Sequence, residues 1–172
     1  MNNFDLKKYI NDYVDFPKQG IVFKDWLPLL LDPVVFREII EEISSWEGFN
    51  SADAIIAIDA RGFIFGSTIA YKLSKPLILA RKSGKLPGKL ITKSYKLEYG
   101  NNELCIQEDS LNKFNNFVII DDLLATGGTV NSVFNIVKDA NKKVTGLFVL
   151  IELLELKGRD IFNFPIKSLL NY

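Results

Sequence analysis

The stretch from residue 117 to residue 137 constrains the fold of this chain most. It combines an apolar run, two acidic residues, a glycine turn and a helical pattern. Residues 117–120 are four consecutive apolar side chains, a pattern typical of a strand covered on both faces in a parallel sheet. Asp121 and Asp122 follow at once, and a turn of small residues comes next. Residues 130–137 then carry apolar side chains at helical spacing. This order predicts a β-strand, a loop and a helix that packs against the sheet.

The turn has the chemistry of a monophosphate site. The first amides of a helix lack intrahelical partners and lie at the positive end of the helix dipole, so they attract an anion. Two glycines let a phosphate approach the backbone, and two threonine hydroxyls each supply a further hydrogen bond. We therefore expect one phosphate to be held by Ala125, Thr126, Gly127, Gly128 and Thr129.

Asp121 and Asp122 indicate what carries that phosphate. Carboxylates next to a phosphate repel it unless they face hydroxyl donors, such as the 2′- and 3′-OH groups of a ribose. A ribose 5-phosphate meets this condition, whereas a nucleoside triphosphate fits poorly. The glycine fingerprints of P-loop and dinucleotide-binding proteins are both absent, which argues against a dinucleotide-dependent oxidoreductase. The alternative is that the two aspartates only end the strand and cap the helix.

Composition excludes several kinds of chemistry. The chain has no histidine, which rules out Ser-His-Asp and Cys-His triads and histidine-ligated metals. Lys plus Arg equals Asp plus Glu at 21 each, so no global field favours nucleic acid or a membrane as a partner. There is one cysteine, and neither a secretory leader nor an apolar run of membrane length is evident. We expect a cytoplasmic protein of one domain.

Apolar runs that alternate with helical patterns predict an α/β fold with an open, mostly parallel sheet. We expect strands at residues 54–58, 76–80, 117–120 and 144–150, and helices over 4–14, from Asp32-Pro33 to about 46, and from about 62 to 73. Ligands of such sheets bind at the carboxyl ends of the strands. Two of the four arginines, Arg61 and Arg81, follow such strand ends, where a planar guanidinium suits a diphosphate. The alternative is that both are solvated on loops.

The hydrophobic pattern fades between residues 83 and 102, where glycines, prolines and lysines predominate. We expect a long basic loop without a core face, and such loops are usually functional. Glu98 is the carboxylate in its central part. We predict that Glu98 manages the proton of a reacting base, the alternative being a solvated glutamate.

Residues 118–129 closely resemble the 5-phosphoribosyl-1-diphosphate (PRPP) signature of the type I phosphoribosyltransferases. Further segments resemble the adenine phosphoribosyltransferase family in its order along almost the whole chain: 16–25 with Asp32-Pro33, 59–63, 81–88, 95–100 and 154–159. The resemblance implies the type I phosphoribosyltransferase fold, a central mostly parallel sheet flanked by helices. It also implies a small base-binding hood from about residues 1–30 and a flexible catalytic loop over about 82–103.

The resemblance further implies a reaction, the formation of AMP and diphosphate from adenine and PRPP. The turn would hold the 5′-phosphate, and Asp121 and Asp122 would hold the ribose hydroxyls. The diphosphate would contact Arg61, Arg81 and Lys85. Adenine would contact Val22, Phe23, Lys24 and Leu123. The catalytic residues would be Glu98, Tyr99, Arg61 and Lys85.

The implied cofactor is Mg²⁺, bound through the diphosphate and ribose hydroxyls of PRPP without direct protein ligands, and the implied assembly is a homodimer. Two other functions stay open from the residues. One is a phosphoribosyltransferase for another base, such as xanthine or hypoxanthine. The other is a non-catalytic PRPP-binding regulator, which would have less reason to keep Glu98 and Tyr99, and no DNA-reading module is evident.

Overall fold

A computed structural model of the chain describes residues 5–96 and 101–172. Its described residues fall into two compact units, Met1–Ile43 and Ser44–Tyr172. In the first unit, β1 (Asn11–Val14) and β2 (Val22–Asp25) pair antiparallel, with Tyr13 opposite Phe23. A 3-10 helix stands on each side of this hairpin, η1 (Leu6–Tyr9) before it and η2 (Leu27–Leu31) after it.

The helix that we expected over residues 4–14 is therefore wrong. Among the described residues of that stretch, the chain forms only the short helix η1 and then the strand β1. A helix this short gains little from its own hydrogen bonds, because nucleation costs more than a single turn returns. Pairing with β2, which lies outside the local pattern, determines the structure instead.

Helix α1 (Pro33–Ser44) begins where the sequence predicted. The Oδ1 atom of Asp32 accepts hydrogen bonds from the amides of Val34 and Val35, at 3.0 and 3.2 Å. These two bonds satisfy amides that have no partner inside the helix.

The second unit contains a seven-stranded sheet in the order β5-β6-β4-β3-β7-β8-β9. Its strands are β3 (Ala54–Ile58), β4 (Leu77–Lys82), β5 (Leu90–Lys96), β6 (Asn101–Gln107), β7 (Asn116–Leu124), β8 (Lys143–Glu152) and β9 (Ile166–Asn171). Its helices are η3 (Glu47–Phe49), α2 (Gly62–Leu73), α3 (Glu108–Asn112), α4 (Gly128–Asp139), η4 (Leu154–Leu156) and η5 (Gly158–Ile161). β4, β3, β7, β8 and β9 run parallel, so the expected mostly parallel sheet is confirmed.

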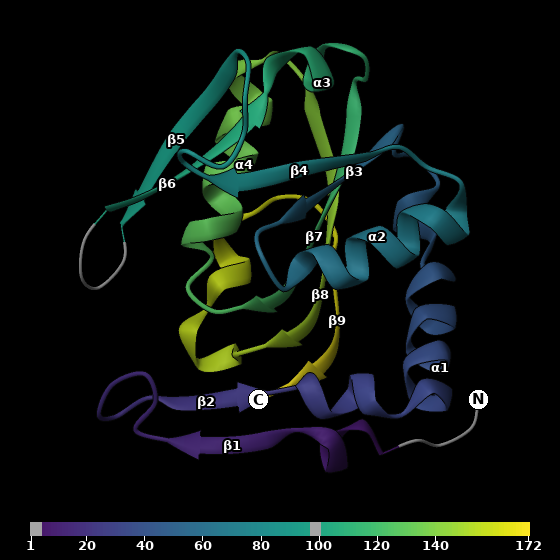
Figure 1. Ribbon diagram of the computed structural model, residues 1–172, viewed down its shortest axis with the longest axis vertical. Coiled ribbons are helices and arrows are strands. Elements are labelled where there is room, and N and C mark those ends of the chain that lie inside the picture. Colours follow the sequence, from purple (N-terminus) through teal and green to yellow (C-terminus); the bar gives the residue numbers. More distant parts are fainter. Residues whose placement is uncertain (1–4, 97–100) are drawn as a thin grey trace. The chain divides into compact units, whose positions relative to one another are not determined.

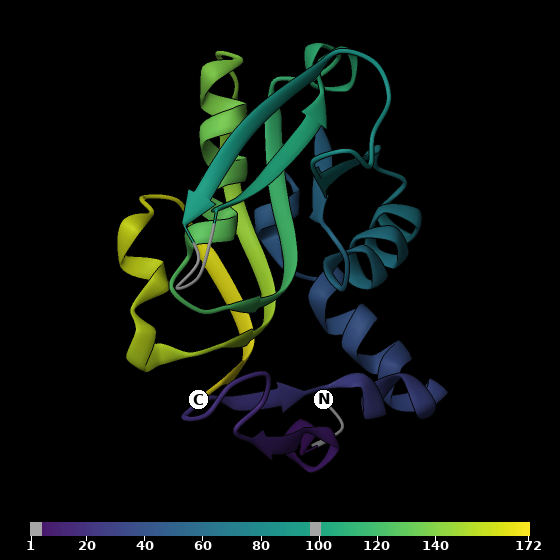
Figure 2. The same ribbon diagram turned by 60° about the vertical axis from the view of Figure 1, so that its left-hand side comes forward.

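The crossovers β3-α2-β4 and β7-α4-β8 lead in opposite directions along the sheet. Because such crossovers are right-handed, their helices must cover opposite faces. Figures 1 and 2 show α2 on one side of the central strands and α4 on the other. The strand order thus reverses between β3 and β7, and the crevice outside their carboxyl ends is where ligands of open α/β sheets bind.

The segment 83–102, which we expected as an irregular basic loop, has no strand over residues 83–89 but contains β5 and the start of β6, which form a β-hairpin. β5 and β6 pair antiparallel, with Thr92 opposite Cys105, and β6 also pairs with β4. Ile91 packs against the core of the unit, and Leu104 and Ile106 belong to that core. This part of the expectation was wrong because threonine, serine and two lysines interrupt the apolar residues of β5, which hides the strand from a hydrophobicity pattern.

Candidate active site

The strand before the glycine turn continues past its apolar run. β7 includes Asp121 and Asp122 and ends at Leu124, and α4 begins at Gly128. Gly127 occupies the cap position with φ of +82°, a conformation that L side chains rarely adopt. The expected strand, turn and helix are confirmed, with the turn shortened by the longer strand.

A cavity of about 400 Å³ opens at the reversal of the strand order. Residues 121–130 line it, together with Asp59, Ala60, Arg61 and Lys82. The turn, both aspartates and Leu123 therefore face one space, which the end of β3 also reaches. The peptide bond between Asp59 and Ala60 in this wall is cis.

The backbone of the turn offers free donors to this cavity. The first regular helical bond runs from the amide of Asn131 to the carbonyl oxygen of Gly127, at 2.8 Å. The amides of the first turn of α4 precede it and have no intrahelical acceptor. Gly127 has no side chain that could occupy them as a cap. The helix dipole adds about half a positive charge at this point, so the turn suits a phosphate.

The two aspartates are buried, with 7% of Asp121 and 6% of Asp122 exposed, yet both line the cavity. The Oδ1 atom of Asp121 accepts the amide of Asp122 at 2.9 Å. Burial, and next the charge of Asp122, raise the pKa of Asp121 well above its ordinary value. Ionising Asp121 therefore costs free energy, and a ligand that donates hydrogen bonds to its carboxylate would offset that cost.

Arg61 pairs with one of the aspartates at the wall of the cavity. Its Nε atom lies 2.7 Å from Oδ2 of Asp122, and a third of its side chain is exposed. The ion pair holds the guanidinium at the cavity, and a planar guanidinium is suited to gripping an anion. The first residue of α2, Gly62, has little room for a side chain, because a Cβ at Gly62 would lie 3.0 Å from Oδ1 of Asp121.

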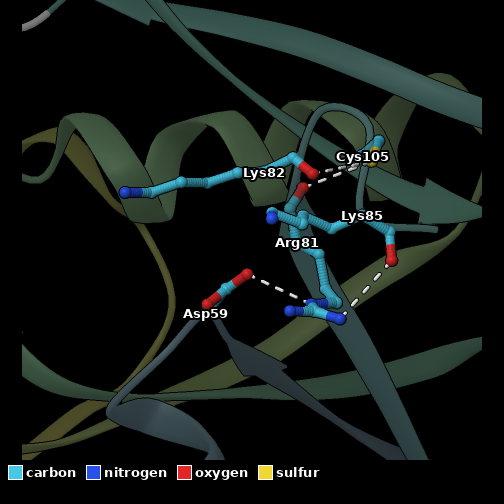
Figure 3. A network of polar contacts seen from close by, with 5 residues as sticks. All are labelled: Asp59, Arg81, Lys82, Lys85 and Cys105. Carbon is cyan, nitrogen blue, oxygen red and sulfur yellow. Dashed lines mark hydrogen bonds and ion pairs between the residues drawn. The ribbon is translucent and has the colours of Figure 1, made fainter.

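Arg81 belongs to a separate polar network (Figure 3). Its Nε atom donates to Oδ2 of Asp59 at 3.1 Å, and its Nη1 atom donates to the carbonyl oxygen of Lys85 at 3.4 Å. The Cys105 thiol donates to the carbonyl oxygen of Arg81 at 3.2 Å. Figure 3 shows the side chain of Lys82 extending away from that of Arg81. The network fixes the end of β4 next to the cavity.

The cavity brings together some of the expected diphosphate residues and not others. Arg61 lines it, and Lys82 lines it where we expected Arg81 and Lys85. In the sequence, Lys82 belongs to the segment 81–88 that resembles the family and follows Arg81 at the end of an expected strand, but it was not predicted as a site residue. The alternation of side chains along a strand is the signal that separates Arg81 from Lys82.

Other expected residues lie elsewhere in the chain. Val22, Phe23 and Lys24 are on β2 of the first unit, where Phe23 meets Phe16 edge to face and Lys24 pairs with Asp12 at 2.6 Å. Glu98 and Tyr99 lie outside the described residues.

Two features are absent from the described residues, a cluster of metal ligands and a membrane-spanning helix. Within residues 5–96 and 101–172, no group of three or more His, Cys, Asp or Glu side chains could hold a metal ion. No helix in the same ranges is long and apolar enough to cross a membrane.

Comparisons with known proteins agree with this geometry. Residues 34–164 match the family model of the phosphoribosyl transferase domain. An adenine phosphoribosyltransferase of Prochlorococcus marinus is 58% identical over 163 residues, covering 95% of either chain. The solved adenine phosphoribosyltransferase of Thermoanaerobacter pseudethanolicus superposes with a TM-score of 0.89 at 38% identity, covering 97% of this chain and 98% of that one.

A third comparison concerns a complex. The adenine phosphoribosyltransferase of Saccharomyces cerevisiae, solved with adenine and an imino-altritol bisphosphate, has a TM-score of 0.87 at 34% identity, covering 95% of this chain and 96% of that one. The fold is therefore the type I phosphoribosyltransferase fold. From its matching domain, its relatives and its fold, the chain belongs to the adenine phosphoribosyltransferase family.

Proposed function

We propose that this protein transfers the 5-phosphoribosyl group of PRPP to adenine, giving AMP and diphosphate. The observation that carries the proposal is the meeting, in one cavity, of an uncapped helix start with two buried carboxylates. The turn 125–129 holds the 5′-phosphate. Asp121 and Asp122 accept the ribose hydroxyls, whose donation offsets the cost of the buried charges.

The leaving diphosphate needs cations at the other side of the ribose. Arg61 and Lys82 line the cavity, and Arg81 and Lys85 belong to the same segment of the chain as Lys82. As the bond at C1 of the ribose lengthens, negative charge grows on the diphosphate, and fixed cations stabilise it. We propose Arg61 and Lys85 as catalytic in this sense, and Arg81 and Lys82 as diphosphate-binding.

Mg²⁺ is the cofactor that we propose. Oxygen donors line the cavity at Asp121 and Asp122, and oxygen is the ligand that Mg²⁺ prefers. We propose that the diphosphate and ribose hydroxyls of PRPP hold the ion directly and that the two aspartates orient those hydroxyls. When bound, the ion neutralises part of the charge on the diphosphate.

The base site is proposed from the family resemblance. Val22 and Lys24 would read adenine through their backbone groups, with Phe23 and Leu123 as apolar walls. Residues 1–30 would form the hood over the base. Glu98 and Tyr99 would close over the reacting centre from the segment 82–103, exclude water and manage the proton of the base. Glu98→Ala should lower turnover about 100-fold while the affinity for PRPP stays near that of the wild type.

We also propose a homodimer in the cytoplasm. The family resemblance supports the dimer, which light scattering would test. The one cysteine, Cys105, is buried and unpaired, which fits a reducing compartment.

The experiment that tests the proposed function is a diphosphate-release assay with PRPP, Mg²⁺ and a panel of bases. We expect release with adenine and little release with hypoxanthine, xanthine or guanine. Release of diphosphate with an oxopurine but not with adenine would show that the oxopurine, and not adenine, is the substrate. PRPP binding without release for any base would make the protein a PRPP-binding regulator.

A further inference from the structure

The end of β8 carries a buried carboxylate that the proposed reaction does not use. Glu152 is 2% exposed. Arg159 donates to it through two bonds, Nε to Oε1 at 2.6 Å and Nη2 to Oε2 at 2.5 Å. Ser168 on β9 donates its hydroxyl to Oε2 at 2.9 Å. This fork ties the helix η5, which contains Arg159, to the ends of two strands.

The residue before Arg159 lies directly behind the phosphate turn. A Cβ at Gly158 would lie 2.1 Å from the carbonyl oxygen of Ala125 and 3.0 Å from the amide nitrogen of Gly127. In the other direction, a Cβ at Gly127 would lie 2.8 Å from the carbonyl oxygen of Gly158. The two backbones therefore touch with no room for a side chain between them.

This contact determines which way an amide of the turn points. In a trans peptide the carbonyl and the N–H group point in opposite directions. The carbonyl of Ala125 is directed at Gly158, so the N–H of Thr126, in the same peptide, is directed away from it. Ala125 and Thr126 both line the cavity, and Gly158 is not among the residues that line it.

We propose that Glu152 and Arg159 are positioning residues for the 5′-phosphate. Their ion pair fixes the position of Gly158 against the turn, and the contact with Gly158 orients the Thr126 amide into the cavity. This inference rests on the proposed function, because it assumes that the turn binds the phosphate of PRPP. None of the three residues touches the substrate. Their effect is on how well the turn is preorganised.

Titration calorimetry with ribose 5-phosphate, which contains the phosphate and the ribose but no base or diphosphate, tests the inference. For Gly158→Ala we expect the affinity to fall about tenfold or more, the size of losing one charge-assisted hydrogen bond. For Arg159→Gln we expect a loss of about 3- to 10-fold, and Arg159→Lys should restore part of it because one bond to Glu152 can re-form.

Steady-state kinetics adds a readout that a structural role alone would not move. At saturating adenine, KM for PRPP should rise in these variants by the same factor as the ribose 5-phosphate affinity falls, while KM for adenine stays constant. Glu155→Gln is the matched control, since Glu155 is an exposed acid of η4 in the same connection. Its affinity and KM should equal those of the wild type.

Two outcomes would overturn the inference. The first is that the Arg159→Gln and Arg159→Lys proteins fold and bind ribose 5-phosphate as tightly as the wild type. This outcome counts whether or not Gly158→Ala folds. The other is a wild-type protein that does not bind ribose 5-phosphate. A wild type that binds it but releases no diphosphate from PRPP with any base contradicts the transfer reaction alone and leaves the positioning role to be decided by the affinities.

Discussion

The adjacent strands β7 and β8 both carry buried carboxylates near their carboxyl ends, and the surroundings of these carboxylates differ. Leu124 is paired in register with Glu152. At the end of β8, hydrogen bonds from Arg159 lower the pKa of Glu152, so the protein itself stabilises the charge. At the end of β7, burial and the neighbouring Asp122 raise the pKa of Asp121, so its charge is poorly compensated.

The difference separates a structural carboxylate from one kept for a ligand. Glu152 has protein donors on both oxygens and lies behind the turn. Asp121 and Asp122 line the cavity, where hydroxyl donors of a substrate reach them. A buried charge that a fold leaves uncompensated in a cavity costs stability, and such costs are typical of functional sites.

The largest expected effect removes the β7 carboxylates. In Asp121→Ala/Asp122→Ala, kcat/KM for PRPP should fall about 10²–10⁴-fold, because two charge-assisted hydrogen bonds of about 1.5–3 kcal/mol each are lost. Diphosphate release measures this. Ser168→Ala removes one donor to Glu152 and no group that lines the cavity, so kcat should stay within about twofold of the wild type. A fall in kcat/KM smaller than tenfold in the double variant would contradict the difference drawn between the carboxylates of β7 and the carboxylate of β8.

Neutralising the buried carboxylate of β8 should destabilise the protein. Glu152→Gln keeps the shape of the side chain but removes the charge that Arg159 and Ser168 bind. We expect the free energy of unfolding to drop by about 2 kcal/mol, the value of hydrogen bonds to a charged group, discounted because Arg159 is 45% exposed and can hydrate. Urea unfolding monitored by circular dichroism gives the number, and no change would mean that the ion pair contributes nothing.

At β7 the matched substitution should have the opposite sign. Asp121→Asn removes a buried charge that repels Asp122, and its amide oxygen can still accept the Asp122 amide. We expect the free energy of unfolding at pH 7 to rise by about 1 kcal/mol, while turnover falls. The urea titration used for Glu152→Gln measures both variants under one condition. A destabilised Asp121→Asn protein would remove the distinction between the two strand ends.

The smallest effect is the pH dependence of these two differences. The pKa of Asp121 is raised in the folded state, so its cost develops as pH rises above the ordinary value of 3.8, and the gain in Asp121→Asn should vanish toward pH 4. The pKa of Glu152 is lowered, so its contribution is complete above the ordinary value of 4.5 and fades below it. Urea midpoints between pH 4 and 8 would show the first difference shrinking on acidification while the second persists to lower pH.

Local patterns were enough to predict the centre of the fold. The apolar runs of β3, β7 and β8 could be recognised because parallel strands are buried on both faces. Asp32-Pro33 predicted the start of α1. β1 was not predicted because it is exposed along its whole length, and β5 was not predicted because polar residues interrupt its apolar ones.

The site divides in the same way. Its turn could be predicted because the turn is continuous in sequence and its function depends on backbone and glycine. The ion pair of Arg61 with Asp122 and the contact of Gly158 with Ala125 each join residues from distant parts of the chain. Only the order of the strands in the sheet brings these residues together, and no local pattern encodes that order.

A crystal structure of the protein with AMP tests the central claim most directly. We predict that the phosphate oxygens lie within hydrogen-bonding distance of the amides from Thr126 to Thr129, and that the two ribose hydroxyls contact the carboxylates of Asp121 and Asp122. A phosphate bound away from the turn, or a ribose whose hydroxyls face solvent while both carboxylates keep only protein partners, would contradict the account.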